Sequence, residues 1–139
     1  SAAEYKPDLI ISGASGYPRD FDHKRFREIA DSVGAALLHD MAHTSGLIAS
    51  KMLSSPFEHC DMVTTTSHKS LRGPRHGLIF YRLKYEKEVR ANAEFKMVGG
   101  PTFNKFASLA VQLEEVATPG FKEYAKQVVL NTKAMQNYM

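Results

Sequence analysis

Short apolar runs recur along the chain, and longer polar or amphipathic stretches separate them. The runs occupy residues 9–11, 36–38, 62–65 and 78–81, and they consist of aliphatic, aromatic and β-branched side chains. Runs of this length and composition are typical of buried strands, whereas helices need longer segments. The pattern therefore predicts a sheet built from these four strands.

The stretch between the first two runs shows helical spacing instead. Its apolar side chains stand three or four residues apart, at Phe26, Ile29, Ala30 and Val33. This spacing predicts a helix through Asp31. Asp22 can cap its first turn and Gly34 can end it.

The C-terminal part of the chain predicts two more helices, from Phe103 onward, with a break at residues 118–120. Each has an apolar stripe, the first made of Phe106, Leu109, Ala110, Leu113 and Val116, the second of Phe121, Tyr124, Ala125, Val128 and Val129. Core packing is the ordinary explanation of such stripes. Strands that alternate with helices predict an α/β fold with a mostly parallel sheet, covered by helices on both faces.

A lysine stands in a hydroxyl-rich segment directly after the third apolar run. Residues 64–75 read Thr-Thr-Thr-Ser-His-Lys-Ser-Leu-Arg-Gly-Pro-Arg, with Lys69 at the centre. Hydroxyls and a histidine can hold a phosphate, and nearby cations favour the unprotonated amine that acts as a nucleophile. Such a segment is typical of a lysine that forms a Schiff base with pyridoxal phosphate. A phosphate-binding turn or an exposed basic loop would use the same residue types.

An acidic side chain ends the second apolar run, in the segment His39-Asp40-Met41-Ala42-His43. Open α/β sheets bind ligands at the carboxyl ends of their strands, and a buried carboxylate there needs a partner. In pyridoxal phosphate enzymes, such a group keeps the ring nitrogen protonated. Two plainer interpretations are that Asp40 caps a helix starting at Met41 and that His43 is a core histidine.

Several segments together resemble the serine hydroxymethyltransferase family. They are residues 38–49, 64–73, 77–82 and 118–129, and the likeness extends from Pro7 to about Ala134. The resemblance implies a fold-type I pyridoxal phosphate enzyme, part of whose large domain is present here. Such an enzyme exchanges a hydroxymethyl group between serine and glycine, with tetrahydrofolate as the one-carbon carrier.

The resemblance also implies roles for individual residues. Lys69 matches the lysine that binds the cofactor, Asp40 the partner of the ring nitrogen, and His43 the group beside the phenolic oxygen. The other cofactor contacts that it implies are Ser15, Thr66, His68, Arg75, Gly99 and Gly100. By the same resemblance, residues 1–101 form the cofactor-binding part of the large domain, and residues 102–139 form a helical segment that leads towards a C-terminal domain.

Family members are much longer than 139 residues. The resemblance covers the central part of the large domain, without the family's arginine that grips the substrate carboxylate, so we expect this chain alone to be inactive. The sequence departs from the family pattern at Val98, at residues 102–105 and at His76. A catalytically retired paralogue that serves as a structural or interaction subunit is therefore the alternative.

Composition limits the remaining possibilities. The chain is 43% hydrophobic and 24% charged, with a net charge of +3, and no apolar run approaches the roughly 20 residues that span a bilayer. The positive charges are interleaved with glutamates, so we expect neither a membrane nor a nucleic-acid partner. One cysteine and no paired-ligand spacing argue against a disulfide and a metal site, and favour a reducing compartment, cytoplasmic or mitochondrial. The family resemblance implies a homodimer or homotetramer.

Overall fold

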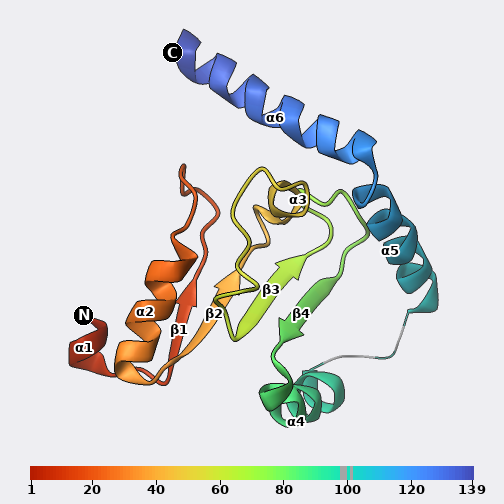
Figure 1. Cartoon of the computed structure of the whole chain (residues 1–139). Helices are drawn as coiled ribbons and strands as arrows, with labels where there is room; N and C mark the ends of the chain where they lie inside the picture. The colour runs from red at the N-terminus through yellow and green to blue at the C-terminus, as the bar shows by residue number, and fades with distance from the viewer. Residues whose placement is uncertain (98–99, 101) are drawn as a thin grey trace.

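The computed structural model describes residues 1–97, 100 and 102–139 and contains a four-stranded sheet (Figure 1). The strands are β1 (Leu9–Ser12), β2 (Ala36–Asp40), β3 (Met62–Thr66) and β4 (Gly77–Tyr81), and they lie in the order β1-β2-β3-β4. The first three strands run parallel, and β4 pairs antiparallel to β3. The predicted α/β fold with a mostly parallel sheet is confirmed.

Helices of very different lengths connect and follow these strands. They are α1 (Ala2–Tyr5), α2 (His23–Val33), α3 (Ser45–Ala49), the 3-10 turn η1 (Leu83–Tyr85), α4 (Glu86–Val89), the π-helical η2 (Arg90–Met97), α5 (Phe103–Val116) and α6 (Pro119–Tyr138). The helix predicted between the first two strands is α2. Its N-cap Asp22 accepts a hydrogen bond from the Arg25 amide at 2.9 Å, and Gly34 ends it with a left-handed φ of 73°.

The core lies between one face of the sheet and the helices α2 and α3. Leu37 of β2 and Val63 of β3 are buried there against Ala30 of α2, with Ile48 of α3 beside them. Each Å² of apolar surface that these side chains remove from water stabilises the folded state by about 25 cal/mol. This burial is the main contribution that holds the two helices on the sheet.

The opposite face of the sheet is open in the part of the chain that the structure describes. Register places Ile11, Leu38 and Met62 in one row on that face, with Tyr81 next to them. Ile11 is 67% exposed and Ile79, farther along β4, is 48% exposed. The expectation that helices cover both faces is therefore wrong for the described residues, because α2 and α3 both pack on the other side.

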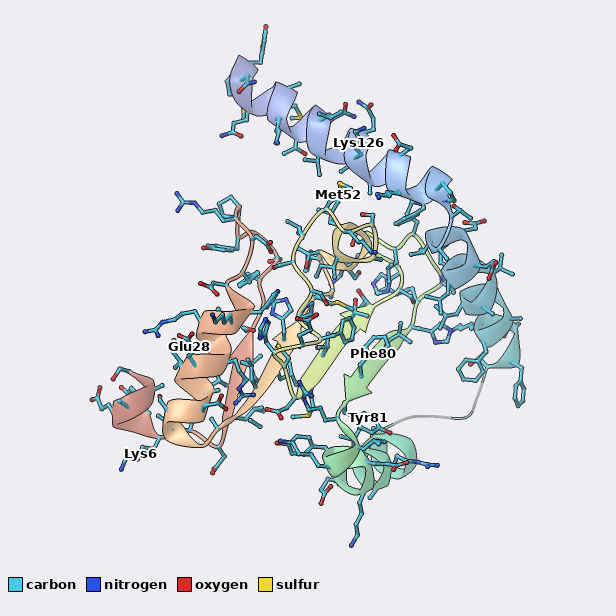
Figure 2. The ribbon with its side chains drawn as sticks, in the orientation of Figure 1. Lys6, Glu28, Met52, Phe80, Tyr81 and Lys126 are labelled. Atoms are coloured by element: carbon cyan, nitrogen blue, oxygen red, sulfur yellow. The ribbon has the colours of Figure 1, made fainter. Side chains whose placement is uncertain are left out.

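Most of the apolar stripe on α5 also faces solvent. Leu109 is buried, but Phe106 and Leu113 are exposed, so the expectation of ordinary core packing is only partly met. On α6, Phe121 and Ala125 are buried near its start. Beyond them the helix extends away from the sheet, and Figure 2 shows side chains projecting all around it, Lys126 among them. Pro119 begins α6, so the break between the two helices is shorter than residues 118–120.

The buried carboxylate of Asp61 connects several elements at the end of the sheet where β2 and β3 begin. Asp61 precedes β3, and its Oδ2 accepts hydrogen bonds from the Leu37 amide at 3.0 Å and from Arg27 Nη1 at 2.7 Å. Lys84 Nζ lies 2.8 Å from its other oxygen. Burial alone raises the pKa of Asp61, but the hydrogen bonds from Lys84, Leu37 and Arg27 outweigh it and lower the pKa to about 2.

Candidate functional site

The lysine singled out by the sequence lies next to one of the two predicted histidine contacts. Lys69 stands in the loop that follows β3, and its Nζ is 3.2 Å from Nε2 of His43, in the loop after β2. Both side chains are exposed. The carboxyl ends of the two parallel strands bring these loops together, as the strand-end argument predicts.

Asp40 ends β2 and is fixed by two hydrogen bonds. Its Oδ2 accepts from the Thr64 hydroxyl at 2.8 Å, and its Oδ1 accepts from the Ala42 amide at 3.0 Å. The side chain is exposed in this structure, so the sequence-based picture of a buried carboxylate is wrong here, because it lies on the open face of the sheet. The capping interpretation is also wrong, since α3 begins at Ser45 with Thr44 as its N-cap.

The residue after Lys69 ties its loop to the start of α3. Ser70 Oγ accepts a hydrogen bond from the Gly46 amide at 3.0 Å and lies 3.3 Å from Ser45 Oγ. The two backbones also touch: a Cβ placed on Gly46 would lie 2.3 Å from the Ser70 carbonyl oxygen. Only glycine lets the backbone at position 46 come this close to the Ser70 backbone. Because Ser70 follows Lys69, the contact fixes the position of the Lys69 backbone.

The loop between β3 and β4, residues 67–76, carries Lys69 and is called the lysine loop. Its own hydrogen bonds close it, and the C-terminal helices contact it. Ser67 is fully buried; its hydroxyl donates to the Pro74 carbonyl and accepts from the His76 amide. Farther on, the Gln112 side chain of α5 donates to the Leu71 carbonyl. The Arg72 guanidinium lies 4.2 Å from the ring centroid of Tyr124 of α6, a cation–π contact.

Two buried polar atoms beside Lys69 have no hydrogen-bond partner among the described residues. They are Thr66 Oγ1 at the end of β3 and His68 Nδ1 in the loop. Buried polar atoms are nearly always paired, so each such atom calls for an explanation, and an absent polar ligand is one. Burial, followed by the positive charges of Arg75 and Lys69, lowers the pKa of His68, which favours a neutral ring that can accept or donate.

Comparison with known proteins decides the family. The family model for serine hydroxymethyltransferase matches residues 1–139. The chain belongs to the serine hydroxymethyltransferase family. Among its relatives, serine hydroxymethyltransferase 4 and the chloroplastic serine hydroxymethyltransferase 3 of Arabidopsis thaliana are each 51% identical over 99% of this chain. Serine hydroxymethyltransferase of Plasmodium falciparum is 48% identical over 96% of it.

The chain spans about a third of the length of these family members. The matched regions amount to 32%, 27% and 31% of the three relatives. The resemblance inferred from the motifs is thus confirmed, and so is its extent over nearly the whole chain.

The remaining cofactor contacts implied by the family pattern lie on other segments or farther along the lysine loop, and Arg75 acts electrostatically on His68 beside Lys69. Ser15 lies exposed in the turn after β1, and Arg75 is exposed in the lysine loop. Gly100 is exposed, with open space where a side chain would stand. Gly99, like Val98, lies outside the described residues, so its role stays a prediction.

Three residues at the site of this family member escaped the sequence argument. Thr64 is the side-chain partner of Asp40, and Gly46 with Ser70 positions the lysine loop. Thr64 could have been found only from the register of β2 against β3, which pairs Asp40 with Thr64. For Gly46, a glycine inside a short helix was the available signal.

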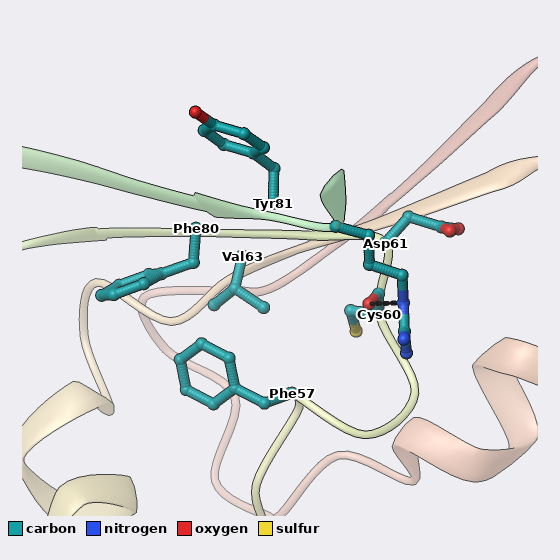
Figure 3. Close-up of a pocket in the computed structure, with 7 residues that line it drawn as sticks. Phe57, Cys60, Asp61, Val63, Phe80 and Tyr81 are labelled. Atoms are coloured by element: carbon teal, nitrogen blue, oxygen red, sulfur yellow. Dashed lines mark hydrogen bonds between the residues drawn. The ribbon is translucent and has the colours of Figure 1, made fainter. Parts of the chain in front are cut away.

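Three hollows lined by described residues lie away from Lys69, His43 and Asp40. Figure 3 shows one of about 110 Å³ on the core side of β3 and β4, lined by Phe57, Cys60, Val63 and Phe80 among others. Burial raises the pKa of the Cys60 thiol to about 11, which disfavours the thiolate that would act as a nucleophile. Within the described residues, no cluster of three or more histidine, cysteine or acidic side chains could hold a metal ion.

Proposed function

We propose that this chain provides the pyridoxal phosphate-binding core of a serine hydroxymethyltransferase, which interconverts serine and glycine with tetrahydrofolate as the one-carbon carrier. One observation carries the proposal: Lys69 Nζ lies 3.2 Å from His43 Nε2, in loops that follow adjacent strands. The unpartnered Thr66 Oγ1 and His68 Nδ1 beside them fit a phosphorylated ligand.

Lys69 provides the covalent attachment. Nζ of Lys69 lies 3.2 Å from Nε2 of His43, so the two groups can share a hydrogen bond. A neutral His43 ring can accept a hydrogen bond from the amine and keep it aimed. The amine of Lys69 would hold the cofactor covalently through its aldehyde carbon.

Asp40 provides the charge that controls the ring. When bound, pyridoxal phosphate supplies an electron sink for charge that develops at the α-carbon of an amino acid. Thr64 and the Ala42 amide each occupy one oxygen of Asp40 and fix its orientation. A carboxylate has about four lone-pair sites, so capacity remains to hold a proton at the ring nitrogen.

The hydroxyl of Thr66 and the ring of His68 are the proposed phosphate contacts, with Ser15 and Arg75 as further cofactor contacts. Gly99 and Gly100 would reach the phosphate of a neighbouring subunit, which is why we expect a homodimer or homotetramer. Short distances between backbone amides and phosphate require small residues of this kind.

Residues 1–101 are the proposed cofactor-binding part, and residues 102–139 the helical segment that leads towards a C-terminal domain. The contacts of Gln112 and Arg72 support a mechanical link between the two parts. Relatives include enzymes named as cytosolic, mitochondrial and chloroplastic. The expected cytoplasmic or mitochondrial location is compatible with two of these. Within the described chain, no helix combines the length and apolar character needed to cross a membrane.

A chimera tests the proposal. Residues 1–139 replace the matching segment of Arabidopsis thaliana serine hydroxymethyltransferase 4, and the formation of glycine from serine is measured with tetrahydrofolate present. We expect turnover, its loss in Lys69→Ala, and no change in Lys133→Ala, an exposed lysine on α6. A folded chimera without turnover, or an active Lys69→Ala chimera, would contradict the proposal and favour the retired-subunit alternative.

A further inference from the structure

The last residue of β1 is fastened to β2 by a buried histidine. Ser12 Oγ lies 2.9 Å from Nδ1 of His39 and 3.3 Å from the Leu38 carbonyl oxygen. The Ser12 hydroxyl can donate only one hydrogen bond. The Leu38 carbonyl oxygen can only accept one, whereas His39 Nδ1 can either donate or accept, depending on the tautomer. Both contacts are therefore satisfied when His39 Nδ1–H donates to Ser12 Oγ and Ser12 donates to Leu38.

His39 is enclosed by other rings. It is 1% exposed; the ring of His23, at the start of α2, lies 4.6 Å away centroid to centroid, and Phe21 lies 5.1 Å away. Burial, and then the neighbouring His23, lowers the pKa of His39 to about 4, and burial also lowers the pKa of His23. The charged or titratable groups that act on this pair are Asp20, Asp22, Asp40 and His59. None of the four is an ion-pair partner of His39 among the described contacts, so at neutral pH the ring is uncharged.

Ser12, which makes these contacts, directly precedes the turn at residues 13–16 that carries Ser15. Gly13 has a φ of 127°, and a Cβ built on it would lie 2.3 Å from the carbonyl oxygen of Asp40. The turn therefore crosses directly over the backbone of Asp40, which follows His39 in β2. Any shift at Ser12 moves the turn relative to Asp40, since the point of contact, Gly13, is the very next residue (β1 and β2 lie side by side in Figure 1).

We propose that His39 is a positioning residue: with Ser12, it fixes the turn at residues 13–16, and so Ser15, against the backbone of Asp40. The inference rests on the proposed function, because Asp40 and Ser15 are taken as cofactor contacts. His39 itself reaches neither the cofactor nor a substrate. Protonation of His39 would place a positive charge in a closed pocket beside His23, which burial disfavours, and release the turn.

The test uses the 139-residue chain in solution, by ¹⁵N NMR, without and with pyridoxal phosphate. We expect His39 to carry its proton on Nδ1. Ser12→Ala and His39→Leu should lower the backbone order parameters of Gly13 and Ala14 from rigid values of about 0.85 to below about 0.6. His39→Asn, which keeps a donor near the Nδ1 position, should restore most of the rigidity. His76→Leu, in the ring stack with Phe106, is the matched control and should leave the turn unchanged.

Two further measurements separate positioning from general stability. On acidification, the signals of Gly13 and Ala14 should move together with the titration of His39 in the wild type, and show no such step in His39→Leu. The affinity for pyridoxal phosphate should fall about three- to tenfold in Ser12→Ala, the size expected for one lost hydrogen bond.

The outcomes are distinguishable. Unchanged turn dynamics in Ser12→Ala, or a His39 Nδ1 without a proton, would overturn the positioning role even if the cofactor binds. If the wild-type chain does not bind pyridoxal phosphate, the proposed function fails, while the tautomer and the turn dynamics still decide the role of His39. Ser12→Ala removes one oxygen only, so the test stands if His39→Leu does not fold.

Discussion

Nζ of Lys69 lies 3.2 Å from Nε2 of His43, although the two residues are 26 positions apart in the chain. The contact exists because β2 and β3 are parallel neighbours, so that both loops leave the same edge of the sheet. It depends on the close packing of Gly46 against Ser70, which holds the lysine loop in place.

The histidine should contribute to cofactor binding by holding the lysine amine. His43→Phe keeps a ring but removes the acceptor, and we expect the dissociation constant for pyridoxal phosphate to rise about three- to tenfold. An absorbance titration measures it. His59 lies before β3, at the opposite end of the strands. His59→Phe is therefore the control and should bind pyridoxal phosphate with the affinity of the wild type. Equal affinities for all three proteins would show that His43 does not hold the amine.

The glycine that touches the lysine loop should tolerate no side chain. Gly46→Ala places a methyl group 2.3 Å from the Ser70 carbonyl oxygen, so either α3 or the lysine loop must move. We expect a loss of about 2 kcal/mol or more in the free energy of unfolding, measured with urea. Gly16→Ala, where a Cβ meets open space, should change it by less than about 0.5 kcal/mol. Similar losses for both variants would refute the packing argument.

The carboxylate at the other edge of the sheet predicts a pH dependence. The folded-state pKa of Asp61 is about 2, lower than the ordinary value of 3.8 for this side chain, so the ionised form stabilises the fold at pH values above about 4. The stabilisation is present at neutral pH and is lost as the pH falls from about 4 through about 2.

Asp61→Asn should therefore lower the free energy of unfolding by roughly 2–3 kcal/mol at pH 7, since each pKa unit corresponds to about 1.4 kcal/mol. The difference from wild type should shrink as the pH falls below 4, which urea titrations across that range would show. Asp31→Asn removes only an exposed partner of Arg27 and serves as the control, with a change below about 1 kcal/mol. A difference between Asp61→Asn and wild type that stays constant with pH would contradict this assignment.

Much of the fold could be predicted from the sequence because its signals are local. The four apolar runs became strands, and Asp22 and Gly34 bound α2 as their capping chemistry requires. The antiparallel direction of β4 could not be predicted, since it follows from how Ser67 closes the loop on Pro74 and His76. The open sheet face could not be predicted either, because an apolar run looks the same whether one or both of its sides are covered.

The sequence allowed the reactive side chains of the candidate site to be predicted, but not the residues that hold those side chains in place. Asp40 ends β2, and His43 and Lys69 lie in the loops that follow β2 and β3, at the carboxyl ends of parallel strands. Thr64 and Ser12 act through the register between strands, which no single segment reveals. The exposure of Asp40 also differs from the prediction, since it depends on which side of the sheet the helices cover.

Borohydride reduction of the purified chain with pyridoxal phosphate, followed by peptide mass mapping, shows whether Lys69 binds the cofactor. The reduction fixes the bond between a lysine amine and the cofactor aldehyde and so records which lysine had reacted. We expect a phosphopyridoxyl adduct confined to Lys69. Adducts spread over surface lysines, or none at Lys69, would contradict it and mean that this chain does not assemble the cofactor site.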